Sequence, residues 1–315
     1  MSVENSNLAA EIRQLARQKN AVIMAHFYTR PEVQDVADFV GDSLALAQRA
    51  AATDARMIIM CGVHFMGETN KILCPGKKVI VPDPAATCSL AESCPAEDFE
   101  RFVRERPGST VVSYVNTTAA VKALTDVVVT SGNAMKIVSA LPTDAKIIFG
   151  PDKNLGAYIN AVTGRDMTLW DGACHVHSRF SVEGILQLRQ QHPQAEVLAH
   201  PECNAAVLRL AHKIGSTAVL LKYAQESGCQ DFIVVTESGI LHKMRLACPE
   251  KNFIPAPPEL SEGSVGCHCN ECEYMRMITL EKIRQCLIDE APEITVDPQI
   301  AEKALRPINR MLEMS

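Results

Sequence analysis

The chain has 315 residues, of which 47% are hydrophobic and 22% are charged, and its formal net charge is −6. This composition is typical of a globular protein that buries a sizeable core, and it argues against nucleic acid as a partner because there is no basic patch. The polar N-terminus lacks the apolar segment of a secretory leader. No stretch approaches the roughly 18 apolar residues of a membrane span, so we expect a cytoplasmic protein with no membrane anchor.

The first third of the chain predicts three strands separated by helical runs. The strands cover residues 21–25, 56–62 and 78–83. The helical run at 31–51 is interrupted at 41–43, which predicts two helices, and a short helix is expected at 64–73. A loop that contains Cys88 follows the third strand.

The same order of elements then recurs twice. The predicted strands cover 110–115, 146–150 and 167–170 in the second round, and 196–199, 231–236 and 252–256 in the third. Helical runs at 118–129 and 205–213 follow the first strand of each round. Strands that alternate with helices predict βαβ connections and parallel sheets, whose ligands bind at the carboxyl ends of the strands.

The spacing of the cysteines follows this repeat. Cys174 lies 86 residues after Cys88, and Cys272 lies 98 residues after Cys174. The longer second spacing indicates an insertion, which contains Cys267 and Cys269. Strand ends and serines in the loops recur at intervals of 85 to 88 residues. The sequence therefore predicts three units of one design.

We predict an α/β fold in which three similar βαβ-type units, with parallel sheets, surround a pseudo-threefold axis and a central active site. The predicted units are residues 1–107, joined by the C-terminal helices of 288–315, then 108–193, and 194–287 with the cysteine-rich insertion. Three independent flavodoxin-like or Rossmann-like domains are the alternative. It is disfavoured because the units are short, no linker separates them, and no GxGxxG motif is present.

Twelve cysteines in a cytoplasmic chain indicate metal or redox groups and buried small residues rather than disulfides. Cys88, Cys174 and Cys272 supply one thiolate from each unit. A closed zinc site requires four ligands, whereas a four-iron cluster on three cysteines leaves one iron open to act as a Lewis acid. An iron–sulfur cluster, a zinc ion and no metal at all remain open on this evidence.

Polar residues recur at two further phases of the repeat. N-capping alone is the better explanation of any single hydroxyl group at an expected helix start, but recurrence in three units favours sites for carboxylate or phosphate. These are Ser43, Ser131, Ser216 and Thr217. Groups suited to proton transfer end the first strand of each unit. These are His26, Tyr28, Tyr114, Asn116, His200 and Glu202. His177 follows Cys174 closely and is a further candidate, whereas the other histidines, including His175, are expected to be structural or on the surface.

Several motifs together resemble the quinolinate synthase family over residues 20 to 288 or so. They include HFY at 26–28, GVHFMGETNKIL, YVNTTAAVKA, GPDKNLG, HPEC, GSTAVLLKY, TESGILHKM and CEYMRMITLEKI. The resemblance implies a triangular fold and a [4Fe-4S] cluster bound by Cys88, Cys174 and Cys272. It also implies condensation of iminoaspartate with dihydroxyacetone phosphate to quinolinate, with loss of phosphate and two waters, for NAD biosynthesis. An L-aspartate oxidase is the expected supplier of iminoaspartate.

By the same resemblance, a set of polar residues lines the substrate pocket. These are His26, Tyr28, Ser43, Tyr114, Asn116, Ser131, His177, His200, Glu202, Ser216 and Thr217. Tyr28, His26 and Glu202 are the expected proton carriers. The rival interpretations are an iron–sulfur hydro-lyase for another hydroxy acid, and a metal-binding scaffold or sensor without turnover.

Two positions depart from the family pattern. Phe27 stands where many relatives have asparagine, so its side chain either changes the pocket wall or lies on the far side of the strand, and strand alternation favours the far side. Cys267 and Cys269 exceed the number of cysteines that the cluster needs. A redox or cluster-delivery role and plain loop thiols are the two interpretations.

Overall fold

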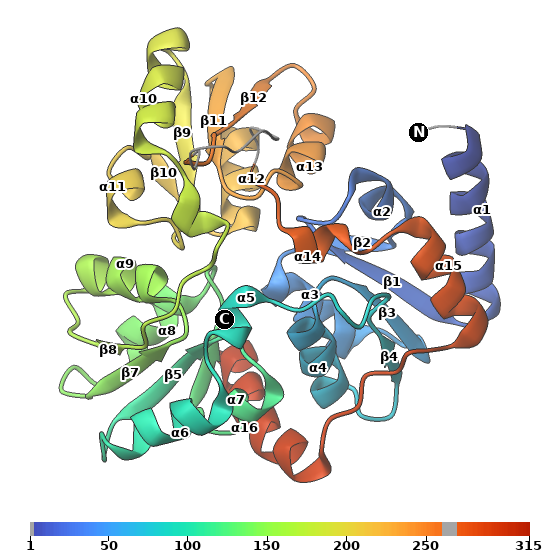
Figure 1. The fold of residues 1–315 in the computed structure, drawn as a ribbon, viewed down its shortest axis with the longest axis horizontal. Coiled ribbons are helices and arrows are strands. Elements are labelled where there is room, and N and C mark those ends of the chain that lie inside the picture. Colours follow the sequence, from blue (N-terminus) through green and yellow to red (C-terminus); the bar gives the residue numbers. More distant parts are fainter. Residues whose placement is uncertain (1–2, 260–269) are drawn as a thin grey trace.

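The computed structural model describes residues 3–259 and 270–315, so Cys267 and Cys269 lie outside the described residues. Three α/β units are arranged around a common centre, each built on its own sheet (Figure 1). All three sheets have four strands, and the neighbouring strands pair in parallel. The α/β class and the threefold repeat predicted from the sequence are confirmed.

The first sheet has the strand order β2-β1-β3-β4. Its strands are β1 (Ala21–His26), β2 (Phe39–Gly41), β3 (Met57–Cys61) and β4 (Lys78–Ile80). The helices of this part of the chain are α1 (Val3–Gln18), α2 (Pro31–Val36), α3 (Ser43–Ala52) and α4 (His64–Leu73). Every residue of β3 is buried, as expected for a parallel strand covered on both faces.

The second sheet repeats this order as β6-β5-β7-β8. Its strands are β5 (Thr110–Tyr114), β6 (Val127–Val129), β7 (Ile147–Gly150) and β8 (Thr168–Leu169). The helices before and around it are α5 (Ser89–Glu92), α6 (Ala96–Arg104), α7 (Ala119–Lys122), α8 (Ala134–Ala140) and α9 (Lys153–Thr163).

The third sheet has the order β10-β9-β11-β12. Its strands are β9 (Glu196–Ala199), β10 (Lys213–Ile214), β11 (Asp231–Val235) and β12 (Asn252–Pro255). Its helices are the 3-10 turn η1 (His177–Arg179), α10 (Val182–Gln191), α11 (Ala205–Leu208), α12 (Thr217–Glu226) and α13 (Ile240–Ala247).

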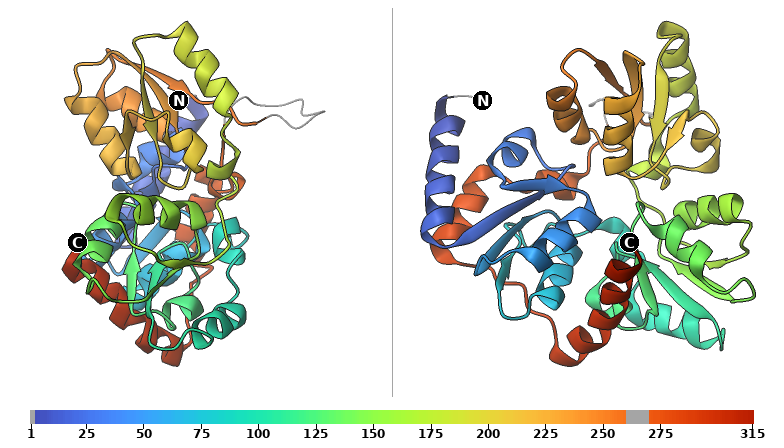
Figure 2. Two further views of the ribbon diagram at one scale, coloured as in Figure 1. Left: turned by 90° about the vertical axis from the view of Figure 1, so that its left-hand side faces the viewer. Right: turned by 180° about the vertical axis from the view of Figure 1, so that it is seen from behind.

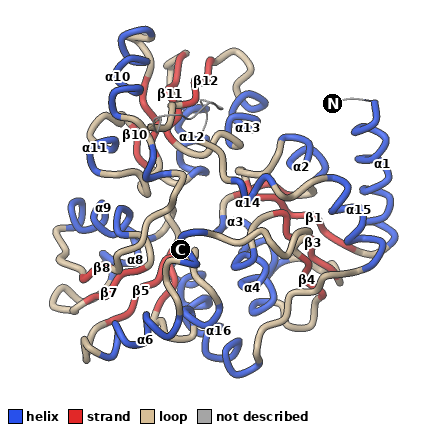
Figure 3. Tube along the Cα trace, viewed as in Figure 1, coloured by secondary structure: helices blue, strands red, loops and turns tan. Residues whose placement is uncertain are grey.

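One strand in each sheet differs from the sequence prediction. β2 and β6 fall within runs that were predicted to be helical, and β10 begins at the last residue of such a run. Each pairs with the first strand of its unit. Figure 3 shows strands and helices in each of the three units. In β6, for example, the three valines Val127–Val129 pair with residues 112–114 of β5. These strands have only two or three residues. Their conformation is decided by pairing with the neighbouring strand rather than by the helical pattern of the local sequence.

The C-terminal helices connect distant parts of the chain (Figure 2). They are α14 (Glu273–Arg276), α15 (Leu280–Asp289) and α16 (Pro298–Met314). The α15 helix packs on α1, where Arg284 Nε donates to Glu11 Oε1 at 2.7 Å. The α16 helix packs against β6, α7 and α4, so it joins the first two sheets. Within the described ranges, no helix is long and apolar enough to cross a membrane.

Candidate active site

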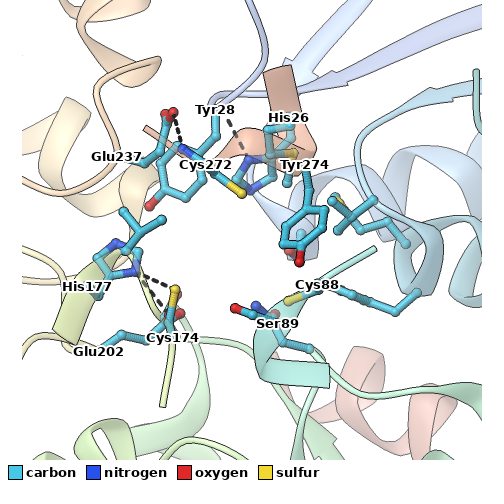
Figure 4. Close-up of a pocket in the computed structure, with 18 of the residues that line it drawn as sticks. His26, Tyr28, Cys88, Ser89, Cys174, His177, Glu202, Glu237, Cys272 and Tyr274 are labelled. Atoms are coloured by element: carbon cyan, nitrogen blue, oxygen red, sulfur yellow. Dashed lines mark hydrogen bonds and ion pairs between the residues drawn. The ribbon is translucent and has the colours of Figure 1, made fainter. Parts of the chain in front are cut away.

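A cavity lies where the three units meet, next to the carboxyl ends of β1, β5, β9 and β11 (Figure 4). Nearly all of the site residues predicted from the sequence line it. These are His26, Tyr28, Ser43, Cys88, Tyr114, Asn116, Ser131, Cys174, His177, His200, Glu202, Thr217 and Cys272. The fold thus brings together residues that lie up to 246 positions apart in the chain.

Ser216 and Phe27 do not line the cavity. The Ser216 hydroxyl accepts from the backbone N–H of Val219, so it caps α12, and it also donates to Asp42 Oδ2 at 3.3 Å. Phe27 is buried against Leu198 and Leu220 of the third unit. Its position outside the cavity agrees with the strand alternation expected from the sequence.

The starts of helices from different units converge on one side of this cavity. The hydrogen bond between Ser216 and Asp42 joins the N-cap residues of α12 and α3. A Cβ atom on Gly132 would lie 3.4 Å from Ser216 Oγ, so the loop before α8 reaches the same place. Ser131 in that loop is 3.2 Å from His200 Nε2. Helix starts and hydroxyl groups that meet in this way suit an anionic group.

Three cysteines face the cavity from different segments. Cys88 precedes α5, Cys174 precedes η1, and Cys272 precedes α14. All three are half-buried free thiols, and Figure 4 shows their sulfur atoms directed toward the same space. Burial raises the pKa of Cys88 to about 12 and that of Cys272 to about 11. Three such thiols are soft donors that need a bound cation to be deprotonated together.

Two buried carboxylates hold the backbone of these cysteines. Asp152 follows β7, and its Oδ2 accepts from the Cys174 N–H at 3.1 Å. Glu237 follows β11, and its Oε1 accepts from the Cys272 N–H at 3.2 Å. Arg276 Nη2 lies 3.2 Å from the same Glu237 oxygen. The backbones of Cys174 and Cys272 are therefore held in the same way. In each case an acidic residue just after β7 or β11 accepts a hydrogen bond from the cysteine N–H group.

A chain of hydrogen bonds runs along the cavity wall from Tyr28 to Glu202. The Tyr28 hydroxyl is 2.6 Å from Thr236 Oγ1, and Thr236 Oγ1 is 2.9 Å from His177 Nε2. His177 Nδ1 is 3.1 Å from Glu202 Oε2, while the Tyr114 hydroxyl donates to Glu202 Oε1 at 2.5 Å. The bonds are consistent if Tyr28 donates to Thr236, Thr236 to His177, and His177 to Glu202. The sequence predicted every member of this chain except Thr236.

Burial sets the protonation states around Glu202. It lowers the pKa of His26 to about 4 and that of His200 to about 3, against the attraction of Glu202, so both imidazoles are neutral near pH 7. Burial also raises the pKa of Tyr28, which stays protonated. For Glu202 itself, burial is outweighed by His177 and His200, so its pKa lies well below the usual range. Glu202 is therefore an ionised carboxylate with neutral imidazoles and a protonated phenol around it.

Asn116 offers a free acceptor. Within the described protein its buried Oδ1 atom has no hydrogen-bond partner. A buried amide oxygen is costly to leave unpaired. We infer that Asn116 is oriented toward a donor group on a bound molecule.

The two neutral histidines make the fold sensitive to acid. Because the pKa of His26 is about 4 in the folded protein and about 6.5 in an unfolded chain, the unfolded state binds this proton first as pH falls. Stability that is complete above pH 6.5 is lost between pH 6.5 and 4. His26 alone should remove about 2 kcal/mol between pH 7 and pH 5.

Urea unfolding at pH 7 and pH 5 measures this loss. The His26→Gln variant, which cannot take up the proton, should lose about 2 kcal/mol less than the wild type over the same interval. His192→Gln at the end of α10, outside the cavity, is the matched control. An equal loss in the wild type and in His26→Gln would contradict the assignment.

Several lining residues were missed by sequence reasoning. They are Asp42, Ser89, His175, Glu237 and Tyr274. His175, expected to be structural or on the surface, contributes Nδ1 at 2.5 Å from Ser89 Oγ in the cavity wall. Glu237 could have been found from the repeat, because it follows β11 of the third unit as Asp152 follows β7 of the second.

This fold and this cavity define a class of α/β enzymes in which three parallel-sheet units each direct one cysteine toward a shared site. A sequence profile described as Quinolinate synthetase A protein matches residues 10–313, and the chain belongs to that family. It is 53% identical over 309 residues to the quinolinate synthase of Thermosynechococcus vestitus, covering 98% of this chain and 96% of that protein. The quinolinate synthase of Trichodesmium erythraeum is 52% identical over 309 residues, covering 98% and 94%.

Proposed function

We propose that the chain condenses iminoaspartate with dihydroxyacetone phosphate to form quinolinate, releasing phosphate and two waters, in the synthesis of NAD. The observation that carries this proposal is the match to quinolinate synthases over 98% of the chain. The cavity supports it because it combines converging helix starts for anions with a carboxylate and protonated phenols for proton transfer.

We further propose that Cys88, Cys174 and Cys272 hold a [4Fe-4S] cluster. Three soft donors that face one space from three units fit a cluster with three protein ligands. When bound, the cluster would supply an open iron that acts as a Lewis acid in dehydration. Asp152 and Glu237 would hold two of the cysteine backbones in place for it.

Anion binding and proton transfer would be carried out by side chains of the cavity. Ser43, Ser131 and Thr217 would bind the phosphate and carboxylate groups at the helix starts. Glu202 would accept protons released during condensation and ring closure, and it would hold Tyr114 and His177 in orientation. Tyr28 would donate a proton to a leaving hydroxyl, since its phenol remains protonated.

Neighbouring steps and the compartment follow from this assignment. Iminoaspartate is unstable in water, so we propose an L-aspartate oxidase as its supplier. The cysteines in residues 3–259 and 270–315 are free thiols, which suits the reducing cytoplasm.

An anaerobic assay tests the proposal. Purified protein is given dihydroxyacetone phosphate together with L-aspartate and an L-aspartate oxidase, and quinolinate is measured by chromatography. Formation of quinolinate that requires both substrates supports the function. Its absence from protein that carries a full complement of iron would contradict it.

Thr236→Val should lower kcat strongly and change KM less. Valine keeps the shape of threonine but leaves the Tyr28 hydroxyl and His177 Nε2 without their shared partner. An unpaired buried group costs about 1 to 3 kcal/mol, so we expect kcat to fall roughly 10- to 100-fold, with a smaller change in KM. Steady-state kinetics of quinolinate formation give both values.

Two further variants test this interpretation of Thr236. Thr236→Ser retains the hydroxyl and should recover most of the turnover. Thr125→Val removes another buried hydroxyl, which bonds Ser113 outside the cavity, and should leave kcat near the wild-type value. Similar losses in Thr236→Ser and Thr236→Val would show that the hydrogen bonds of Thr236 are unimportant.

A further inference from the structure

A second set of metal-binding side chains overlaps the cysteine site at one residue. The side-chain donor atoms of Cys174, His177 and Glu202 all lie within 4.8 Å of one another. His177 Nδ1 is 3.4 Å from Cys174 Sγ and 3.1 Å from Glu202 Oε2. Zinc with ligands about 2.1 Å away has tetrahedral edges of about 3.4 Å. The two distances from His177 Nδ1 are therefore close to those between ligands of a single ion.

Partners outside this triad hold its members in place. His177 Nε2 is 2.9 Å from Thr236 Oγ1, so when Nδ1 binds a metal the Nε2–H group has an acceptor. Glu202 Oε1 accepts from the Tyr114 hydroxyl at 2.5 Å, whereas Oε2 lies 3.1 Å from His177 Nδ1, so a metal bound by both atoms would replace that contact. The backbone of Cys174 is fixed by Asp152. Such outer contacts are typical of sites that bind zinc tightly.

We propose that Cys174, His177 and Glu202 bind one zinc ion when the iron–sulfur cluster is absent. One thiolate, one imidazole and one carboxylate form a mixed donor set that suits zinc better than magnesium or calcium, and three protein ligands leave a fourth position open toward the cavity. The two negative ligands balance the charge of the ion.

This zinc site has a consequence for cluster assembly, which rests on the proposed function. Cys174 cannot bind zinc and remain a ligand of the cluster. Zinc in the cluster-free chain therefore blocks assembly of the cluster. Binding of zinc itself depends only on the triad, so it can be tested whether or not the protein makes quinolinate.

Zinc binding to full-length, iron-free protein is the first measurement. Equilibrium dialysis under anaerobic conditions, followed by elemental analysis, should give about one zinc per chain in the wild type. His177→Ala and Glu202→Gln should weaken binding more than 100-fold, because loss of an outer partner alone typically costs 10- to 100-fold. Thr236→Val, which removes such an outer partner, should weaken it about 10-fold.

Matched variants separate this site from one made by the three cysteines. Cys88→Ala and Cys272→Ala should retain zinc within about threefold, and so should His175→Ala, which removes the neighbouring cavity histidine. Loss of zinc in Cys88→Ala and Cys272→Ala, with retention in His177→Ala, would overturn the proposal. So would the absence of tight zinc binding to the wild type.

Cobalt gives a second readout, which reports the number of sulfur ligands. Cobalt bound to the wild type at the triad should show the thiolate charge-transfer absorption of one sulfur ligand, and Cys88→Ala should leave that intensity unchanged. Intensity that falls by a third in Cys88→Ala would indicate three thiolates and overturn the triad. Anaerobic reconstitution should fail with one equivalent of zinc in the wild type and succeed in His177→Ala. Assembly of a full cluster on wild type that keeps its zinc would disprove the shared use of Cys174.

Discussion

Alanine in place of Cys88, Cys174 or Cys272 should abolish quinolinate formation and remove the iron. Each residue supplies the one thiolate that its segment directs into the cavity, so no nearby cysteine can replace it in the described structure. We expect iron to fall from about four per chain to a small fraction of that, with loss of the broad charge-transfer absorption. Iron and sulfide analysis, together with an absorption spectrum of anaerobically purified protein, measures the effect.

Buried cysteines elsewhere provide the matched controls. Cys203 and Cys248 are buried, and their thiols bond the backbone carbonyl oxygens of Val235 and Ala224. Cys203→Ala and Cys248→Ala should retain iron and activity, since they act as small core residues. If one of the three cavity variants kept both iron and turnover, its cysteine would not be a ligand.

The main strands were predictable because their sequences are continuous apolar runs. The segments over β1, β3, β5 and β11 consist of Val, Ile, Met and other apolar residues bounded by turns, which is typical of a parallel strand buried on both faces. The edge strands β2, β6 and β10 were not predictable in this way. Their existence depends on a partner strand that the local sequence does not reveal.

The cysteines and the polar ends of the first strands were predictable because they recur at one phase of the repeat. Thr236 and Asp152 were missed because they follow β11 and β7, whereas the recurring polar residues lie at the ends of β1, β5 and β9. Ser216, by contrast, was predicted to line the cavity but does not. Recurrence of a serine at a helix start predicts its place but cannot distinguish a capping hydroxyl from one that faces the cavity, since both need the same residue type.

Glu202→Gln should lower turnover by a factor of about 10² to 10⁴ without removing iron. Glu202 is a buried acceptor in the cavity wall, bonded by Tyr114 at Oε1 and by His177 at Oε2. An amide presents an NH₂ group to one of these donors, so one bond becomes a repulsion. It also removes the negative charge that would take up a proton during condensation.

Kinetics and metal content of the Glu202→Gln variant are measured together. Quinolinate formation and iron per chain are determined for the wild type and for Glu202→Gln, with Glu271→Gln as a control. Glu271 pairs with Arg276 outside the cavity lining, so its variant should keep most of the turnover. Because glutamine cannot ionise, raising the pH should not restore the variant. Turnover within threefold of the wild type would exclude Glu202 as a proton carrier, whereas a parallel loss of iron would make it a structural support of the cluster.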